Sequence, residues 1–209
     1  MVDVELYGGK RGFLEHMRAR ALYALGAYRG SDAIEWAAVG RLAFVCKGNI
    51  CRSPYASAKA LSLGIAAASF GLDAREGEGA DPVALKNSAI RGMDLSSHRS
   101  ARLDATGLED GDLVIVFEPL HLAEVRRRLG NRTPVSLLGI WSRPLQPHIQ
   151  DPYGRSDRYF QRCFSVIDAN IAKLVEHMAR NAAPAARDLA PDVRRAKAMH
   201  RNPCKRMRD

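Results

Sequence analysis

Cysteine and long apolar runs are both scarce in this 209-residue chain, and each shortage excludes a class of protein. The four cysteines, at positions 46, 51, 163 and 204, are too few and too unevenly spaced for a disulfide framework. No CxxC or HxxxH pair offers neighbouring zinc ligands, so we expect neither a metal nor another cofactor. No apolar run approaches the roughly 18–20 residues of a membrane span, and the first residues lack the apolar core of a secretory signal. We therefore expect a cytoplasmic protein.

The net charge of +9 reflects 32 Lys/Arg against 23 Asp/Glu. Most of this excess lies at one end, because residues 180–209 hold nine Lys/Arg against three Asp/Glu. The rest of the chain is close to neutral, which argues against a basic face for nucleic acid on the folded part. The tail over 181–209, rich in Ala, Arg and Pro, is expected to be a weakly ordered, solvated extension.

An amphipathic helix is predicted over residues 13–28, where apolar residues recur at three- and four-residue steps among arginines. A helix packed on the domain is the simplest interpretation. A helix at a membrane interface or against a partner protein is the alternative.

After residue 40, short apolar runs alternate with helical patterns. The predicted strands are 41–46, 65–70, 112–117 and 134–138, and the predicted helices are 54–63, 81–91, 120–129 and 157–179. Strands this short and apolar, separated by helices, indicate a parallel sheet covered on both faces. We therefore expect an α/β three-layer sandwich with a central four-stranded parallel sheet over residues 41–180, preceded by an N-terminal helical extension over 1–40.

The turn between the first strand and its helix carries the strongest chemical signal. It reads CKGNICR from Cys46 to Arg52, and ligands of open parallel sheets bind beyond the carboxyl ends of strands. Gly48 and Asn49 tolerate the dihedrals that let successive N–H groups converge on an anion, and the helix N-terminus adds its dipole. Arg52 could close on the same anion with its planar fork. The same field would stabilise the thiolate of Cys46, which makes this residue a candidate nucleophile.

The sequence FVCKGNICRSP, at residues 44–54, resembles the phosphate-binding loop of the low-molecular-weight protein tyrosine phosphatases. The resemblance extends from about residue 42 to 177. Further motifs follow in the order of that family: ASFG at 68–71, DLSSHRSAR at 94–102, LLG at 137–139 and QDPYG at 150–154. The resemblance implies hydrolysis of protein phosphotyrosine and of small aryl phosphates.

The resemblance also implies a role for each matching residue. Cys46 would be the nucleophile that forms a phosphocysteine intermediate, and Arg52 would bind the phosphoryl oxygens. Ser53 would donate its hydroxyl to the sulfur of Cys46. Asp151 would protonate the leaving phenolate and then activate water. Tyr153 would flank the pocket and stack on the phosphotyrosine ring.

Other residues are implied to surround the phosphate or to support the loop. The loop residues around the phosphate would be Lys47, Gly48, Asn49, Ile50 and Cys51. Asn49, with Ser69 and His98, resembles the family's network that holds the loop in shape. From the residues alone, Asp151 lies in an ordinary Asp-Pro-Tyr-Gly turn and His98 is a structural histidine.

Several positions depart from the common family pattern or leave their role open. After the third strand, where relatives commonly have Ala-Met-Asp, this chain has Val116-Phe117-Glu118-Pro119, and Glu118 could keep the charge there. Gly154 replaces a second aromatic residue. Lys47 is basic where many relatives are apolar, which predicts a preference for acidic or multiply anionic substrates. Cys51 could form a protective, reversible disulfide with Cys46, as in relatives with this pair, or could simply pack as a small residue.

Two other functions are alternatives. An arsenate reductase of the same fold needs further cysteines to relay a disulfide, and Cys163 and Cys204 lie in the predicted last helix and the tail. A non-enzymatic phosphotyrosine-binding regulator would need neither a nucleophile nor an acid. Bacterial relatives often oppose tyrosine kinases of polysaccharide assembly, so such a kinase is a candidate partner. The other expected partner is the phosphotyrosine protein substrate. No nucleic acid is expected to bind.

Overall fold

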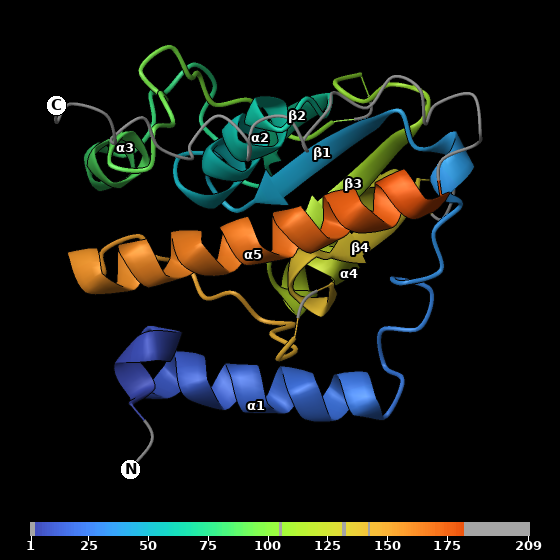
Figure 1. Ribbon diagram of the computed structural model, residues 1–209, viewed down its shortest axis with the longest axis horizontal. Coiled ribbons are helices and arrows are strands. Elements are labelled where there is room, and N and C mark those ends of the chain that lie inside the picture. Colours follow the sequence, from blue (N-terminus) through green and yellow to red (C-terminus); the bar gives the residue numbers. More distant parts are fainter. Residues whose placement is uncertain (1–2, 105, 131–132, 142, 182–209) are drawn as a thin grey trace, which may run out of the picture.

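The computed structural model describes residues 3–104, 106–130, 133–141 and 143–181. Its sheet contains β1 (Arg41–Cys46), β2 (Ala67–Gly71), β3 (Asp112–Val116) and β4 (Val135–Leu137). All neighbouring strands are parallel, in the order β2-β1-β3-β4 (Figure 1). The expected α/β fold with a four-stranded parallel sheet is confirmed.

Helices cover both faces of this sheet. They are α2 (Arg52–Ser62), α4 (Pro119–Leu129) and α5 (Asp157–Asn181), while α3 (Pro82–Ala89) packs on α5. Leu42 and Phe44 of β1 pack on one face with residues of α2 and α5, whereas Ala43 and Val45 pack on the other face with residues of α4. Figure 1 shows α5 across the front of the sheet. The near-continuous apolar run of β1 is thus explained by burial on both sides.

Local chemistry sets the ends of these elements. Strand β2 begins at Ala67 and not at residue 65, because residues 64 and 65 belong to the C-terminal cap of α2. Gly64 has a left-handed φ of 77°, and Ile65 N donates a hydrogen bond to Ala60 O. At the start of α3, the carboxylate of Asp81 accepts bonds from two N–H groups of the first turn, and Pro82 follows it.

Helix α2, which follows the chemically interesting loop, is fixed against α5. The ring of Tyr55 stacks on that of Phe164 with centroids 3.8 Å apart. The hydroxyl of Tyr55 donates to Asp168 of α5 at 2.7 Å. The first turn of α2 therefore has a defined place relative to the C-terminal helix.

Residues 3–40 pack back onto the body of the protein. Helix α1 (Lys10–Ala24) buries Gly12, His16 and Ala19, and Figure 1 shows the segment before α5 lying between α1 and α5. Ser136 of β4 donates to the carbonyl of Ser31 at 2.5 Å. Helix α1 ends earlier than the pattern predicts, because Gly26 has a φ of 76°.

Within the described ranges, no helix combines the length and the apolar character needed to cross a membrane. The basic tail expected over 181–209, with Cys204, lies outside the described residues after Asn181.

Candidate active site

Asn49 holds the loop between β1 and α2 in its shape. Its φ of 55° is left-handed, a conformation that asparagine tolerates better than most residues. Asn49 Nδ2 donates to Ser53 Oγ at 2.8 Å and to Ser69 Oγ at 3.0 Å, and Oδ1 accepts from Ala101 N at 2.8 Å. His98 Nε2 donates to Asn49 O at 2.7 Å, since a carbonyl can only accept. The structure therefore brings together Asn49, Ser69 and His98, the three residues that the family resemblance groups around the loop.

The end of β2 supports the loop from behind. Leu72 N donates to Cys46 O at 2.9 Å, and Asp73 N donates to Lys47 O at 2.8 Å. A Cβ added to Gly71 would lie 2.8 Å from Lys47 O, so this close backbone contact requires glycine.

The sulfur of Cys46 lies at the carboxyl end of β1 and is buried. Asn49 N donates to Cys46 Sγ at 3.3 Å, and Ser53 Oγ lies 3.0 Å from the same sulfur. Ser53 Oγ also lies 3.2 Å from Phe70 O. Because a hydroxyl has one proton, Ser53 can give it either to the strand carbonyl or to the sulfur.

Arg52, the first residue of α2, is fully buried and connects the loop to two distant segments. Its Nη1 bonds to the carboxylate of Glu118 and, at 2.8 Å, to Ile149 O. Its Nη2 lies 2.8 Å from Asp151 Oδ2. Arg52 Nε has no hydrogen-bond partner in the part of the chain that the structure describes. A buried N–H without a partner is unfavourable, so this nitrogen is suited to donate to a bound oxyanion.

Glu118, whose role the sequence left open, lies between Arg52 and His121. Burial alone would raise the pKa of Glu118, but the positive charge of Arg52 outweighs it and holds this pKa below its ordinary value. His121 Nε2 lies 3.8 Å from Glu118 Oε1. Glu118 therefore stays ionised and compensates the buried charge of Arg52.

Asp151 reaches the loop from the segment before α5. Its Oδ1 accepts a bond from Tyr153 N at 3.2 Å, while Oδ2 faces Arg52. The Asp151 side chain is 31% exposed, and Tyr153 is 61% exposed. The carboxyl group thus lies at the boundary between the buried loop and solvent, with an aromatic ring outside it.

Cys46, Cys51 and Cys163 are free thiols, and all three are buried. Burial, followed by the carboxylates of Asp81 and Asp151, raises the pKa of Cys51. The protective disulfide between Cys46 and Cys51 stays a prediction.

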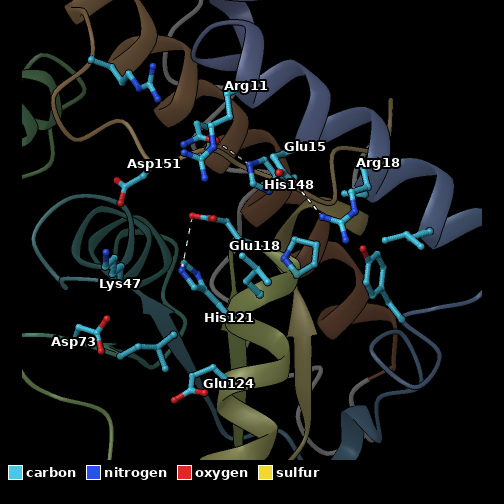
Figure 2. Close-up of a pocket in the computed structure, with 18 of the residues that line it drawn as sticks. Arg11, Glu15, Arg18, Lys47, Asp73, Glu118, His121, Glu124, His148 and Asp151 are labelled. Atoms are coloured by element: carbon cyan, nitrogen blue, oxygen red, sulfur yellow. Dashed lines mark hydrogen bonds and ion pairs between the residues drawn. The ribbon is translucent and has the colours of Figure 1, made fainter.

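A cavity of about 710 Å³ adjoins this loop (Figure 2). Charged and imidazole side chains from five segments line it, and they include Lys47 of the loop, Asp73 after β2, Glu118 and His121 at the start of α4, His148 and Asp151 before α5, and Arg11, Glu15 and Arg18 of α1. Cys46 and Arg52 are not among its lining residues. The cavity therefore lies beside the anion loop and does not contain it.

Known proteins share this arrangement of loop, sheet and helices. A family model described as "Low molecular weight phosphotyrosine protein phosphatase" matches residues 41–184. The chain belongs to the low molecular weight protein tyrosine phosphatase family. It is 34% identical, over 131 residues, to the probable low molecular weight protein-tyrosine-phosphatase EpsP of Ralstonia solanacearum, across 61% of this chain and 88% of that protein.

Two solved structures of tyrosine phosphatases agree with this assignment. Erwinia amylovora AmsI is 33% identical, with a TM-score of 0.61 over 66% of this chain and 93% of that chain. Escherichia coli K30 Wzb, in complex with sulphate, is 26% identical, with a TM-score of 0.62 over 67% of this chain and 99% of that chain. The family and the enzyme class expected from the sequence are confirmed.

Sequence reasoning missed part of the surroundings of this phosphatase loop. His121 and His148 stand in no motif of the sequence, yet both are buried and both line the cavity. The signal for His121 was available, since it follows Glu118 by three residues at the start of a helix, where the two side chains share a face. Nothing in the sequence around Arg11 indicated that its side chain lines the same cavity.

The buried histidine predicts that acidification destabilises the phosphatase. Burial, and then the charge of Arg52, lowers the pKa of His121 from 6.5 to about 4. Between these values the unfolded state binds a proton that the folded state does not, so stability falls as the pH decreases through this window. We expect His121 to account for a loss of about 1–2 kcal/mol in the free energy of unfolding between pH 7 and pH 5.

Urea unfolding at both pH values checks this expectation on wild type and His121→Gln. The variant is expected to be less stable at pH 7, because its amide replaces a packed ring, but to lose less stability on acidification. Parallel pH dependence in the two proteins would contradict the prediction.

Proposed function

We propose that this phosphatase hydrolyses protein phosphotyrosine, and small aryl phosphates, through a phosphocysteine intermediate on Cys46. One observation carries the proposal: Cys46 Sγ lies 3.0 Å from the Ser53 hydroxyl and 3.3 Å from Asn49 N, in the loop from which Arg52 reaches Asp151. Membership of the family and the sulphate complex of Wzb support it. The exposed ring of Tyr153 supports an aromatic substrate.

In the first step, the sulfur of Cys46 attacks phosphorus, and the bond between phosphorus and the phenolic oxygen breaks. Arg52 and the N–H groups of the loop bind the phosphoryl oxygens. Binding of these oxygens would take Arg52 Nη2 from Asp151, which leaves that carboxyl group for the leaving oxygen. Asp151 donates its proton there, so a neutral phenol departs.

In the second step, water attacks the phosphorus of the phosphocysteine, and Asp151 accepts the proton of that water. The bond between sulfur and phosphorus breaks, and inorganic phosphate leaves. The hydroxyl of Ser53, 3.0 Å from the sulfur, donates to the thiolate as it forms. The two steps return Cys46 and Asp151 to their starting forms.

The alternatives from the sequence have weaker support. Arsenate reduction needs a further cysteine that relays the disulfide away from the loop, but Cys163 is buried in α5 and Cys204 lies outside the described residues. A binding module without activity would not need Asp151 beside Arg52.

The test compares three activities of the wild-type protein. They are hydrolysis of a phosphotyrosine peptide, hydrolysis of the same peptide with phosphoserine, and reduction of arsenate in the presence of thioredoxin. Acid quenching with a labelled substrate, followed by mass spectrometry, locates the covalent phosphate. We expect turnover of the phosphotyrosine peptide and label on Cys46. Turnover of arsenate alone, or label on another residue, would overturn the proposal.

Lys47 is expected to favour acidic substrates, because its exposed ammonium group lines the cavity next to the nucleophile. Lys47→Leu should lower kcat/KM for an acidic phosphopeptide by about three- to fivefold, the effect of one exposed ion pair, with less change for a neutral aryl phosphate. Lys173→Leu, on the exposed side of α5, is the matched control. Equal effects of Lys47→Leu on both substrates would remove this explanation.

The physiological substrate is proposed to be a tyrosine-phosphorylated protein of the cytoplasm. A tyrosine kinase of polysaccharide assembly is the candidate partner, on the strength of the family resemblance. The absence of a basic excess outside the tail supports a protein substrate over nucleic acid.

A further inference from the structure

The first turn of α1 lies directly on the segment that carries Asp151. A Cβ added to Gly8 would lie 2.9 Å from Gln150 Cγ, and one added to Gly12 would lie 3.3 Å from the same atom. A Cβ added to Gly9 would lie 3.7 Å from Arg155 Nη1. Small residues thus let α1 approach this segment more closely than larger residues would allow.

Two further contacts fix α1 in this place. His16 is buried beside His148, and burial, followed by the charges of Arg20 and His148, lowers the pKa of His16 to about 4. Its ring is therefore neutral at pH 7 and packs as an uncharged group. Asp3, just before η1 (Val4–Tyr7), accepts a bond from Arg158 of α5 at 2.8 Å. Helix α1 is consequently a fixed wall of the cavity.

The cavity between α1 and the phosphate loop is lined by five carboxylates and five Lys or Arg side chains, and three of these cations are left without an ion pair in the described part of the chain. Each lining carboxylate has a cationic partner: Glu15 pairs with Arg18, Asp73 and Glu124 with Arg128, and Glu118 and Asp151 with Arg52. Lys47, Arg11 and Arg155 are exposed and have no ion pair within the described ranges. In the view of Figure 2, Arg11 and Lys47 lie on either side of Asp151.

We propose that Arg11, with Arg155 and Lys47, forms an anion subsite beside the phosphate loop, which binds the carboxylate of an acidic residue next to the phosphotyrosine. This inference rests on the proposed function. It adds a specificity-determining residue, Arg11, from a helix that lies outside the family match over 41–184.

The chemistry of these side chains favours a carboxylate. A guanidinium group binds a carboxylate with two parallel hydrogen bonds, and Arg11 and Arg155 supply two such groups. A peptide with its phosphate in the loop and its ring near Tyr153 would have its neighbouring residues over the cavity. Since the cations are exposed, each contact is modest and sensitive to salt.

The test compares Arg11→Gln with wild type on two phosphotyrosine peptides that differ only in flanking Glu or flanking Gln. Lys10→Gln is the matched control, because it removes the same charge one residue away, from a side chain that does not line the cavity. We expect Arg11→Gln to lower kcat/KM for the acidic peptide about three- to tenfold, and for the amide peptide and p-nitrophenyl phosphate less than about twofold. The loss should shrink as ionic strength rises from about 0.05 to 0.5 M.

Equal losses on both peptides, or a wild type that does not distinguish them, would overturn the subsite while leaving the proposed function intact. Absence of any hydrolysis by wild type, of p-nitrophenyl phosphate included, would instead refute the proposed function and the subsite with it. Arg11 is exposed, so an unchanged unfolding midpoint in Arg11→Gln is expected and separates lost recognition from lost folding.

Discussion

Replacing Cys46 by serine is expected to reduce hydrolysis of a phosphotyrosine peptide on the order of 10⁴-fold or more. Among the described residues, its sulfur has the hydroxyl of Ser53 at 3.0 Å and the N–H of Asn49 at 3.3 Å within hydrogen-bonding distance. Neither is a base that could take a proton from a serine hydroxyl, so the substituted side chain would remain a poor nucleophile. Arg52 and the loop N–H groups are unchanged, so the variant should still bind the peptide.

Phosphate release and calorimetric binding of the phosphotyrosine peptide measure these two expectations separately. Ser62→Ala, at the exposed C-terminal end of α2, is the control, because it removes a hydroxyl that does not contact the loop. Its activity should stay close to that of wild type. Full activity in Cys46→Ser would rule out covalent catalysis by this residue, and loss of binding in that variant would point to a damaged loop.

Asp151→Asn is expected to lower kcat by about 10²–10⁴-fold for substrates with poor leaving groups. The amide has the same shape and can keep the bond from Tyr153 N, but it has no acidic proton to donate. Arg52 loses one carboxylate partner in this variant and keeps the other, Glu118. The effect should therefore fall on proton transfer more than on the position of Arg52.

A series of aryl phosphates, ordered by the acidity of the leaving phenol, separates these two roles. In Asp151→Asn the rate should depend steeply on that acidity, and nitrophenolates should suffer least. Asp157→Asn, an exposed residue paired with Lys86, is the control and should follow wild type. A loss of the same size for every leaving group would show that Asp151 only positions Arg52.

The sheet and the phosphate loop could be predicted because their determinants are close together in the sequence. The apolar run of β1, the left-handed residue Asn49, and Arg52 at the start of α2 all lie within residues 41–52. Residues this close in sequence can be placed relative to one another without knowledge of the tertiary fold. Asp151 was different: its turn is ordinary, and only the family resemblance directed attention to it.

The wall formed by α1 could not be predicted from its pattern. Amphipathic spacing indicates which face of a helix is buried, but not which part of the protein buries it. The contact depends on Gly8 and Gly12, and glycine in a sequence indicates a turn as readily as a close approach. Glu118 also needed the structure, because its partner Arg52 is 66 residues away and joins it only when β1 and β3 pair.

The bonds from Leu72 and Asp73 to the carbonyls of Cys46 and Lys47 continue the pairing of β2 with β1 into the loop. Opening the loop would therefore break the sheet at Gly71, the partner of Cys46 in the register. The conformational entropy of the loop is consequently lost when the chain folds, and not when an anion binds. Phosphate affinity should thus depend little on induced fit, and binding and the folded sheet should disappear together in one cooperative transition.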